Sequence, residues 1–364
     1  MTREEEIRAA QEKFGELIRS EYERIEMMKQ DSEVKDFSKL DHIVIGIMPG
    51  DGIGPIIMEQ ALRVVNSLLR DEIASGRVEI REIPGMTIER RAQLLESLPA
   101  DVLENCKKCD VLVKGPFVTP RAGEGLPNLV SANSLLRRSL QLFAAVRPIR
   151  IPEKNIDWTF FRENIEGEYI WGNKGIRVND DLAVDFKVCT TPGAERIARA
   201  AFDFARKNGK KSVTVVTKAN IVKLVDATAA KMMDSEFNKG MEVIVLPNLY
   251  GDIVTDVAAE QQGGLGTACS SNIGNKYALF EAIHGTAPYL MSHGRGHHAD
   301  PCSLIRAMGA MMAHIGYADR KEILEKALEI CTVTERRVVV TTQLEDASTA
   351  EFTDYLLETI EKIR

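Results

Sequence analysis

The sequence predicts an α/β fold in which a mainly parallel sheet is covered by helices. Apolar, strand-like runs at 42–48, 78–83 and 110–114 alternate with helix-like segments at 56–69 and 94–106. Such alternation is typical of βα units, whose strands pair in parallel beneath their connecting helices. The 364 residues are enough for two domains of ordinary size or for one large α/β unit.

The second half of the chain continues this alternation. We expect a strand at 184–190, a helix at 192–207, a strand at 212–217 and a short buried strand at 243–246. From Asp252 onward the sequence becomes helical again. No internal repeat or low-complexity linker divides the chain, so domain boundaries have to be argued from the motifs.

Composition and charge exclude several classes of protein. Hydrophobic residues make up 44% of the chain and charged residues 28%, which is typical of a soluble globular enzyme. The net charge of −7 argues against a nucleic-acid binder, and no apolar run approaches the roughly 20 residues of a membrane span. The cysteines are scattered, and the CxxC at 106–109 lacks a second Cys/His pair. We therefore expect reduced thiols in a cytoplasmic protein.

Residues 1–38 form a charged N-terminal extension with apolar positions at helical spacing. Those positions are Ile7, Ala10, Phe14, Leu17, Ile18, Ile25 and Met28. Acidic residues at 4–6 argue against a mitochondrial presequence, and the segment has no apolar signal core. We expect an amphipathic helix that docks on the body of the protein or on a neighbouring subunit.

A glycine-rich turn, Pro-Gly-Asp-Gly-Ile-Gly-Pro at 49–55, follows the strand at 42–48 and precedes a helix. Glycine allows the backbone to approach a ligand closely, and a helix N-terminus attracts phosphate. The glycines stand at 50, 52 and 54, so the ordinary Rossmann fingerprint GxGxxG is absent. A dinucleotide-binding loop and a simple tight turn both fit this pattern.

Three arginines in otherwise apolar surroundings, Arg137, Arg147 and Arg162, indicate a pocket for a polycarboxylate. A guanidinium group can hold a carboxylate bidentately, and Ser131 and Asn133 stand just before the first arginine. The alternative is that each arginine is solvated or forms a structural ion pair.

Two aspartates four residues apart, Asp252 and Asp256, form a candidate metal site. On a helix this spacing places them on one face of the first turn. Stacked carboxylates repel each other unless a cation lies between them, and hard oxygen ligands suit Mg²⁺ or Mn²⁺. An acidic first turn favoured by the helix dipole is the alternative. Lys218, at the carboxyl end of the strand at 212–217, and His284, in a turn-rich loop, are further candidates for ligand contact.

Eight motifs in order carry a family resemblance. They are GDGIGP (50–55), KGP (114–116), SxNxxLR (131–137), AVRP (145–148), RENxEGEY (162–169), TKAN (217–220), PNLYGDIVTD (247–256) and HGTAP (284–288). Together they resemble the metal-dependent β-decarboxylating dehydrogenases, which include isocitrate, 3-isopropylmalate, homoisocitrate and tartrate dehydrogenases. The resemblance runs from about residue 43 to the C-terminus, and SxN with RENxEGEY is most similar to the isocitrate branch.

This resemblance implies an isocitrate/isopropylmalate dehydrogenase-like fold, with two α/β domains and a central cleft. Residues 39–142 and 263–364 would form a large dinucleotide-binding domain, and residues 143–262 a smaller substrate and dimerisation domain. The resemblance also implies a homodimer with a shared active site, in which Lys218 and Asp226 reach the partner's site.

The resemblance further implies roles for individual residues. Metal ligands would be Asp252, Asp256 and Asp226; tricarboxylate ligands would be Ser131, Asn133, Arg137, Arg147 and Arg162; and proton transfer would use Tyr169 and Lys218. Contacts to the dinucleotide would come from Gly52, Ile53, Thr119, Asn272, Glu281, His284, Gly285, Thr286, Ala287 and Asp300. The implied reaction is the oxidative decarboxylation of isocitrate to 2-oxoglutarate and CO₂.

The residues favour NAD over NADP as the cofactor. NADP-dependent relatives place Lys-Tyr directly after HGTAP, where this chain has Tyr289-Leu290. Glu345 and Asp346 stand where such relatives carry an arginine that grips the 2′-phosphate. An acidic side chain repels that phosphate and accepts a hydrogen bond from a ribose hydroxyl instead. Arg295 could pair with a phosphate, so NADP stays open.

Two departures from the family pattern stand out. Ile56 replaces the glutamate that commonly follows GDGIGP, and Lys218 stands only eight residues before Asp226, where relatives interpose a helix and a strand. In one alignment Asp226 is the third metal ligand, and in another it matches an aspartate that binds no metal. Two alternatives therefore stay open. One is a catalytically weak regulatory subunit that works with an intact partner, and the other is a dehydrogenase of isopropylmalate, homoisocitrate or tartrate.

Overall fold

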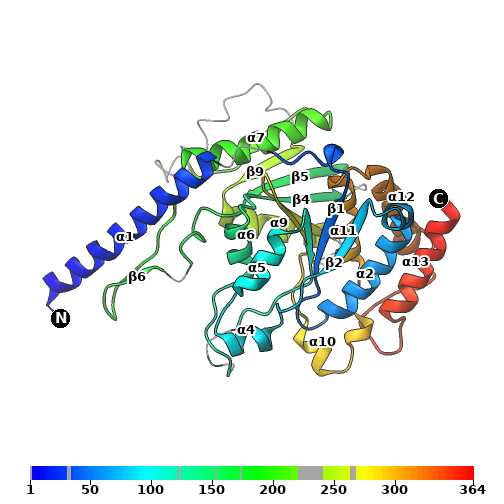
Figure 1. Ribbon diagram of the computed structural model, residues 1–364, viewed down its shortest axis with the longest axis horizontal. Coiled ribbons are helices and arrows are strands. Elements are labelled where there is room, and N and C mark those ends of the chain that lie inside the picture. Colours follow the sequence, from blue (N-terminus) through cyan, green and yellow to red (C-terminus); the bar gives the residue numbers. More distant parts are fainter. Residues whose placement is uncertain are drawn as a thin grey trace.

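The computed structural model describes residues 2–30, 34–120, 123, 125–151, 154–172, 174–219, 241–262 and 268–364. Within these residues the chain is organised around a nine-stranded sheet of order β2-β1-β3-β11-β10-β4-β5-β9-β8 (Figure 1). The strands are β1 (Ile43–Met48), β2 (Val78–Glu82), β3 (Val111–Lys114), β4 (Ala144–Ile151), β5 (Ile156–Glu163), β8 (Val213–Val215), β9 (Val243–Leu246), β10 (Cys269–Ile273) and β11 (Ala278–Ala282). A separate ribbon pairs β6 (Ile176–Arg177) with β7 (Ala183–Val184).

The sheet is parallel at both ends and antiparallel in the middle. Strands β2, β1, β3 and β11 run in parallel, and so do β5, β9 and β8. The pairs β11–β10, β10–β4 and β4–β5 are antiparallel. The prediction of a mainly parallel sheet is confirmed, but its two parallel halves run in opposite directions. Along the strand direction, the carboxyl ends of β3 and β11 therefore point the opposite way from the carboxyl ends of β5 and β9.

Helices cover both faces of this sheet. The helices of the described residues are α1 (Arg3–Gln30), α2 (Gly54–Leu68), α3 (Arg70–Ala74), α4 (Ile88–Leu94), α5 (Ala100–Lys107), α6 (Ala132–Ser139), α7 (Thr191–Lys207), α9 (Asn248–Gln262), α10 (Pro288–Ser292), α11 (Cys302–His314), α12 (Ala318–Glu329) and α13 (Thr349–Ile363), and not all of them contact the sheet. Ile43, Ile45 and Ile47 of β1 pack in one core with α2 and α11, whereas Val44 and Met48 face α5 and α6. None of the helices in the described ranges is long and apolar enough to cross a membrane.

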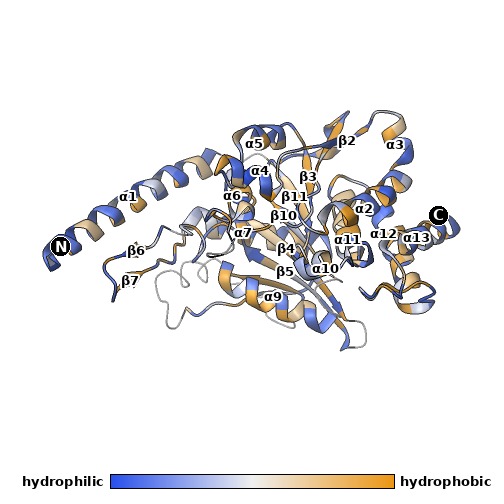
Figure 2. Ribbon diagram, turned by 90° about the horizontal axis from the view of Figure 1, so that it is seen from below, coloured by the Kyte–Doolittle hydropathy of each residue, from blue (hydrophilic) through white to orange (hydrophobic). Residues whose placement is uncertain are grey.

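The half of the sheet that contains β5 and β9 is covered by α7 and α9. Phe161, Val243 and Val245 belong to the core beneath α7, and the alternate residues Phe160 and Ile244 belong to the core beneath α9. Helix α9 crosses β5 and β4 on the outside of the sheet (Figure 2). This crossing brings the helix over the strands that carry two of the predicted substrate arginines.

Helix α1 extends away from the body beside the β6–β7 ribbon (Figure 1). Its buried residues, all in the second half of the helix, are Leu17, Glu21, Arg24 and Met28. In the first half, Ile7 and Phe14 each remain 42% exposed. The helix is therefore docked mainly through its second half, where Leu17 joins the core beneath α7.

The helix expected at 94–106 begins at Ala100 instead. Leu95 ends α4 in a left-handed conformation, with φ of 57°. Pro99 then precedes the first turn of α5, where its fixed φ is compatible with a helix start. A single apolar pattern in the sequence thus spans two helices and a turn.

Two other boundaries also differ from the expectation. In place of the strand expected at 184–190, the structure has the two-residue strand β7, which pairs with β6, and an isolated bridge between Val188 and Gly167. Helix α9 begins at Asn248 rather than at Asp252. Asp252 therefore lies one turn inside the helix, and the expectation of an acidic first turn is wrong.

Candidate active site

The predicted metal and substrate residues come together where α9 crosses β4 and β5. Arg147 lies on β4 and Arg162 on β5, on the face that α9 covers. Arg147 Nη1 lies 2.8 Å from Asp256 Oδ1, and its Nη2 lies 3.7 Å from Asp252 Oδ1. Arg162 Nη1 forms an ion pair with the same oxygen of Asp252. Two predicted substrate ligands thus neutralise two predicted metal ligands.

Small and polar residues of α9 allow this close approach. At Gly251 a Cβ atom would lie 2.6 Å from Cγ of Arg162, so a larger residue would push the helix away. Asn248 Oδ1 accepts hydrogen bonds from Nε and Nη2 of Arg162, at 2.9 and 2.7 Å. Thr255 Oγ1 accepts one from Nη1 of Arg147, at 2.6 Å. Asn248 and Thr255 were not predicted as site residues, although both belong to the PNLYGDIVTD motif.

Tyr169 joins the cluster from the segment that follows β5. Its hydroxyl donates a hydrogen bond to Asp252 Oδ2 at 3.1 Å, and the Arg162 guanidinium lies 5.6 Å from its ring centre. Partial burial and the negative charge of Asp252 raise the pKa of Tyr169. The phenol is therefore protonated at neutral pH, and with 36% of its surface exposed it is accessible to a ligand.

The charges of Arg137 and Arg147 act on the third predicted substrate arginine, Arg162. Burial and the neighbouring charges of Arg137 and Arg147, opposed by Asp252, lower the pKa of Arg162 to about 10. The guanidinium still carries its charge at neutral pH. Guanidinium groups gathered in this way can pair with the carboxylates of a ligand once they are released from Asp252 and Asp256.

Helix α6 positions two further predicted substrate residues. Ser131 is its N-cap, and Ser131 Oγ accepts a hydrogen bond from Ser134 N at 3.4 Å. The helix that starts at this cap carries Asn133 in its first turn and Arg137 in its last. The predicted role of Ser131 as a ligand for the substrate is thus accompanied by a structural role at the start of the helix.

A cavity of about 200 Å³ opens beside these residues. Its lining includes Lys114, Asn133, Arg137, Arg147, Glu281 and His284. Three buried polar atoms nearby, Asn133 Oδ1, Ser270 Oγ and His284 Nε2, have no hydrogen-bond partner in the described part of the chain. The cavity therefore suits a polar ligand, and predicted substrate residues meet predicted dinucleotide residues along its wall.

Glu281 is the centre of a buried network on this wall. Lys114 Nζ lies 2.6 Å from its Oε2, and Arg137 Nη2 lies 3.1 Å from its Oε1. Asn272 Nδ2 donates to Oε1 at 2.8 Å, and Asn272 is 0% exposed. Burial alone would raise the pKa of Glu281, but Lys114 and Arg137 hold that pKa well below its usual range. Glu281 and Asn272, predicted as dinucleotide contacts, are thus engaged with protein groups.

Lys114 was not predicted as a site residue. Lys114 is the last residue of β3 and is 3% exposed. Its ammonium lies 4.6 Å from the ring centre of Phe117. The signal in the sequence was a lysine at the carboxyl end of an apolar strand, directly before Gly-Pro. Such a lysine has to find an anionic partner when the strand is buried, and here that partner is Glu281.

The GDGIGP and HGTAP loops contact each other directly. Ile53 N donates a hydrogen bond to Thr286 O at 3.2 Å. Gly52 has φ of 60°, and a Cβ atom there would lie 2.2 Å from the same carbonyl oxygen. Gly52 is therefore required for the packing of the two loops. A Cβ atom at Gly285 would meet no heavy atom within 4 Å, so this part of the second loop is open to a ligand.

The remaining predicted dinucleotide residues have varied surroundings. Ala287 follows in the HGTAP loop with a left-handed φ of 49°, and Thr119 is exposed in the segment after β3. Asp300 Oδ1 accepts a hydrogen bond from Cys302 N at 2.9 Å, at the start of α11. Asp300 therefore contacts the first amide of α11, and its dinucleotide role stays a prediction.

Two predicted residues are not joined to the cluster by the contacts described above. Lys218 is exposed, beyond the end of the edge strand β8, and Asp226 lies outside the described residues. In the described ranges, no group of three His, Cys, Asp or Glu side chains could hold a metal ion. Asp252 and Asp256 nevertheless provide two hard oxygen donors, which fit Mg²⁺ or Mn²⁺ when substrate oxygens and water complete the coordination.

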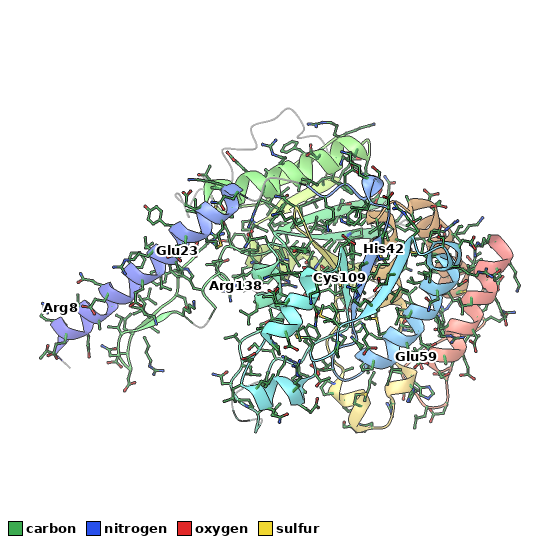
Figure 3. The ribbon with its side chains drawn as sticks, viewed as in Figure 1. Arg8, Glu23, His42, Glu59, Cys109 and Arg138 are labelled. Carbon is green, nitrogen blue, oxygen red and sulfur yellow. The ribbon has the colours of Figure 1, made fainter. Side chains whose placement is uncertain are left out.

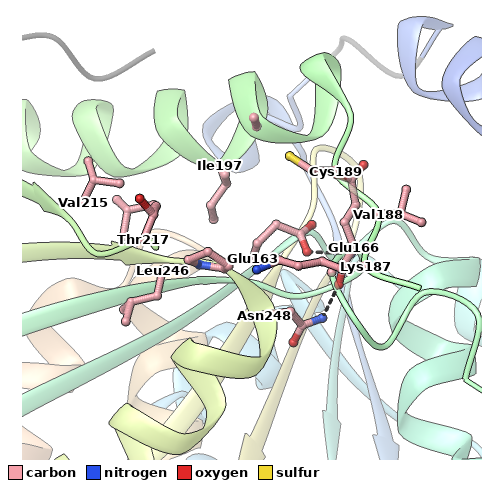
Figure 4. A pocket seen from close by; sticks show the side chains of 14 residues that line it. Glu163, Glu166, Lys187, Val188, Cys189, Ile197, Val215, Thr217, Leu246 and Asn248 are labelled. Carbon is pink, nitrogen blue, oxygen red and sulfur yellow. Dashed lines mark hydrogen bonds between the residues drawn. The ribbon is translucent and has the colours of Figure 1, made fainter. Parts of the chain in front are cut away.

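A smaller cavity, of about 40 Å³, lies between α7 and the end of β9 (Figure 4). Most of its lining is apolar, and its polar members include Glu163, Glu166 and Lys187. This volume suits ordered water rather than a tricarboxylate. The larger cavity beside the arginines is therefore the candidate substrate site.

Known proteins resemble this chain over most of its length. A family model described as isocitrate/isopropylmalate dehydrogenase matches residues 44–225 and 222–356. Homoisocitrate dehydrogenase of Methanocaldococcus jannaschii is 31% identical over 357 residues, covering 87% of this chain and 97% of that protein. A mitochondrial regulatory subunit of isocitrate dehydrogenase (NAD) from Dictyostelium discoideum is 34% identical over 347 residues, covering 87% of this chain and 91% of that protein.

The structural match has the same extent. The crystal structure of isocitrate dehydrogenase from Methylococcus capsulatus aligns with a TM-score of 0.74 and 30% identity, covering 87% of this chain and 99% of that chain. The two segments of the family match meet at residues 222–225, within the connection that is short in this sequence. By sequence, fold and motif order, the chain belongs to the isocitrate/isopropylmalate dehydrogenase family.

Proposed function

We propose that this protein catalyses the oxidative decarboxylation of isocitrate to 2-oxoglutarate and CO₂, with NAD and with Mg²⁺ or Mn²⁺. The observation that carries the proposal is the contact of Arg147 and Arg162 with Asp252 and Asp256, with Tyr169 hydrogen-bonded to Asp252. Cationic groups for carboxylates, oxygen donors for a metal and a phenol for proton transfer thus stand together. This combination suits a hydroxy acid that is oxidised and then loses CO₂.

In this proposal the substrate is held by its carboxylates. Arg137, Arg147 and Arg162 bind them through the planar fork of the guanidinium group. Asn133, which lines the larger cavity, donates its amide N–H groups to the carboxylate that distinguishes isocitrate, together with the hydroxyl of Ser131. Binding at several points orients the hydroxyl-bearing carbon of the substrate toward the dinucleotide loops.

Asp252 and Asp256 hold the metal in this proposal, and the third ligand is Asp226 of the partner subunit. When bound, the cation would polarise oxygens of the substrate, and NAD would supply the hydride acceptor. Arg147 and Arg162 neutralise the two aspartates in this structure. On binding of metal and substrate, these arginines turn from the aspartates to the substrate carboxylates.

Two side chains move protons. Tyr169 gives its phenolic proton to the carbon that has lost CO₂, and its raised pKa supports this role because the phenol stays protonated at neutral pH. Lys218 of the partner subunit takes the proton of the substrate hydroxyl. The proposal therefore includes a homodimer with a shared active site.

NAD is the proposed dinucleotide, with NADP as the alternative. Glu345 and Asp346 are exposed in the segment before α13, where their charge would repel a 2′-phosphate. Arg295 is partly buried beyond α10 and is the cationic group that could accept such a phosphate. The ratio of activity with the two dinucleotides tests this preference.

The domain division and the location also belong to the proposal. Residues 39–142 and 263–364 would form the dinucleotide-binding domain, and residues 143–262 the substrate domain. All six cysteines are free thiols, which supports a reducing compartment such as the cytoplasm.

Steady-state reduction of NAD and NADP with isocitrate and Mn²⁺ tests the proposed function. Isopropylmalate, homoisocitrate and tartrate serve as controls, and homoisocitrate matters most because one relative is named for it. We expect turnover with isocitrate and a preference for NAD. Turnover with one of the other acids and none with isocitrate would transfer the proposal to that acid.

A regulatory subunit is the second candidate function. The short connection between Lys218 and Asp226 favours it, and so does the similarity to a relative whose name describes a regulatory subunit. Binding of Mn²⁺ and isocitrate by a folded protein without turnover of any of the acids would support this candidate. Retention of Tyr169 and of both aspartates on α9 favours the active enzyme.

A further inference from the structure

The N-terminal helix α1 precedes the residues that match the family, yet it contacts the RENxEGEY segment through buried charges. Arg24 is 8% exposed, and its Nη2 atom lies 2.7 Å from Glu21 Oε2 and 2.8 Å from Glu166 Oε1. Burial alone would lower the pKa of Arg24, but the charges of Glu166 and Glu21 raise it. Arg24 is thus a charged bridge between α1 and the segment that follows β5.

From Glu166, polar contacts lead to the candidate active site. The backbone carbonyl of Glu166 accepts a hydrogen bond from Asn248 Nδ2 at 2.8 Å (Figure 4). Oδ1 of the same asparagine accepts two hydrogen bonds from Arg162, which in turn pairs with Asp252. A continuous path of contacts therefore joins Arg24 to a predicted metal ligand.

The carboxylate of Glu166 is also tied to the start of α7. Its Oε2 accepts a hydrogen bond from Thr190 N at 2.8 Å, and its Oε1 accepts one from Thr190 Oγ1 at 2.5 Å. Glu166 therefore links α1, α7 and the segment after β5. Loss of Arg24 would remove the cation with which this buried carboxylate forms an ion pair.

Helix α1 holds the far end of the same segment as well. Trp171 is 7% exposed, and its Nε1 donates a hydrogen bond to Glu21 Oε1 at 2.9 Å. Tyr169 stands between Glu166 and Trp171, with its hydroxyl directed to Asp252. Two contacts from one helix therefore bracket the tyrosine that faces the aspartates.

We propose that α1 orders the 166–171 segment for catalysis, with Arg24 as a positioning residue that acts through Glu166. The catalytic part of this inference rests on the proposed function, whereas the ordering of the segment does not. Apolar contacts alone would suffice to dock a helix, and a buried ion pair adds little stability compared with well-packed apolar side chains. A buried ion pair does fix the position of the helix, because a shift of either partner would leave a buried charge without its counter-charge.

The same helix supplies a matched control. Arg8 lies near the free end of α1 and is exposed, well before the buried stretch that contacts the body (Figure 3). Arg24→Met and Arg8→Met remove the same charge from the same helix. Arg24→Lys keeps a cation that can reach Glu166 and tests for rescue.

Two measurements on the whole 364-residue chain separate ordering from activity. Amide hydrogen exchange of peptides spanning residues 163–171 reports the order of the segment. Steady-state kinetics with isocitrate, Mn²⁺ and NAD report kcat and KM separately. We expect Arg24→Met to accelerate exchange at 163–171 and to lower kcat/KM about tenfold, mainly through kcat, because the tyrosine is misplaced. Arg8→Met should match the wild type, and Arg24→Lys should lie between the two.

The outcomes separate this inference from the proposed function. Wild-type exchange at 163–171 and wild-type kcat in Arg24→Met would overturn the positioning role, even if the melting temperature fell. If Arg24→Met does not fold, the same two measurements on Arg24→Lys test the positioning role. Exchange faster than in the wild type and a kcat below the wild-type value would then support it, and wild-type values of both would overturn it. Faster exchange in Arg24→Met, combined with a wild type that never turns over isocitrate, would reject the proposed function and keep the ordering by α1.

Discussion

Arg147 and Asp256 contact each other directly, with 2.8 Å between Nη1 and Oδ1. The arginine is a predicted ligand of the substrate and the aspartate a predicted ligand of the metal. A carboxylate that pairs with an arginine presents less negative charge to a cation, and the same arginine is less available to a carboxylate. Binding of metal and binding of substrate should therefore be linked, since each releases a partner for the other.

We predict that isocitrate tightens the binding of Mn²⁺ by about tenfold, which is an ordinary coupling free energy between two sites. Calorimetric titration of Mn²⁺ with and without isocitrate measures this ratio, and the reverse titration should give the same factor. Asp256→Asn should weaken Mn²⁺ binding in both titrations because it removes a charged ligand. Equal Mn²⁺ affinities with and without isocitrate would contradict the linkage.

Tyr169→Phe should lower kcat by about 10²- to 10⁴-fold with little change in KM for isocitrate, as expected when a general acid is lost. The phenol is protonated at neutral pH because burial and Asp252 raise its pKa. Phenylalanine keeps the ring beside Arg162 and removes only the hydroxyl that donates to Asp252.

Tyr22→Phe is the control for this change, because Tyr22 is 68% exposed on α1. Its kinetics should equal those of the wild type. A Tyr169→Phe enzyme with normal kcat would remove the tyrosine from the proton-transfer step.

Short-range parts of the site could be predicted from the sequence, and contacts between distant segments could not. The spacing of Asp252 and Asp256 on one helix places both near the same strands, as periodicity implies. The pairing of Arg147 with Asp256 joins residues 109 positions apart. It depends on the order of β4 and β5 in the sheet, which no local pattern encodes.

Helix boundaries failed for a related reason. Local propensity favours Asn248 as the end of a strand, because asparagine and glycine are typical of turns. In the structure Asn248 is 1% exposed, and it starts α9 with its side chain bonded to Arg162 and to the carbonyl of Glu166. Tertiary hydrogen bonds thus satisfy a polar side chain that local propensity assigns to a turn.

The buried carboxyl of Glu163 should make stability depend on pH. Burial, and next the charge of Glu166, raise its pKa to about 8 from the ordinary 4.5. Between these values the folded state binds a proton that the unfolded state has released, so the free energy of unfolding falls as pH rises. The stabilising contribution is complete below about pH 4.5 and is lost as pH approaches about 8.

Glu163→Gln should remove this dependence, because the amide cannot ionise. Chemical denaturation at pH 5 and pH 8 should show a wild type that loses stability relative to Glu163→Gln as pH rises, by an amount on the order of a few kcal/mol. Glu23→Gln, on the exposed side of α1, is the control and should follow the wild type (Figure 3). Parallel pH profiles for wild type and Glu163→Gln would show that Glu163 is ionised in the folded protein.

Glu281 and Lys114 should behave as one unit in stability measurements. Glu281→Gln leaves the buried Lys114 and the partly buried Arg137 without the carboxylate that pairs with both. Removing one partner of a buried pair costs about 3–5 kcal/mol. Lys114→Met should also destabilise the protein, because Glu281 then loses one of the two cations, Lys114 and Arg137, with which it pairs. Denaturant unfolding of both single variants and of the double variant measures the coupling.

We expect the double variant, Lys114→Met with Glu281→Gln, to lose about 1–3 kcal/mol less than the sum of the single losses. The ammonium of Lys114 and the carboxylate of Glu281 lie 2.6 Å apart, with 4% and 7% of their side chains exposed. Removing either charge therefore leaves the other buried without this partner. Arg63 and Asp354 form an exposed pair of the same kind, and their cycle should give a coupling near the 0–1 kcal/mol typical of surface pairs. Additive losses at Lys114 and Glu281 would mean that the two charges do not depend on each other in the folded protein.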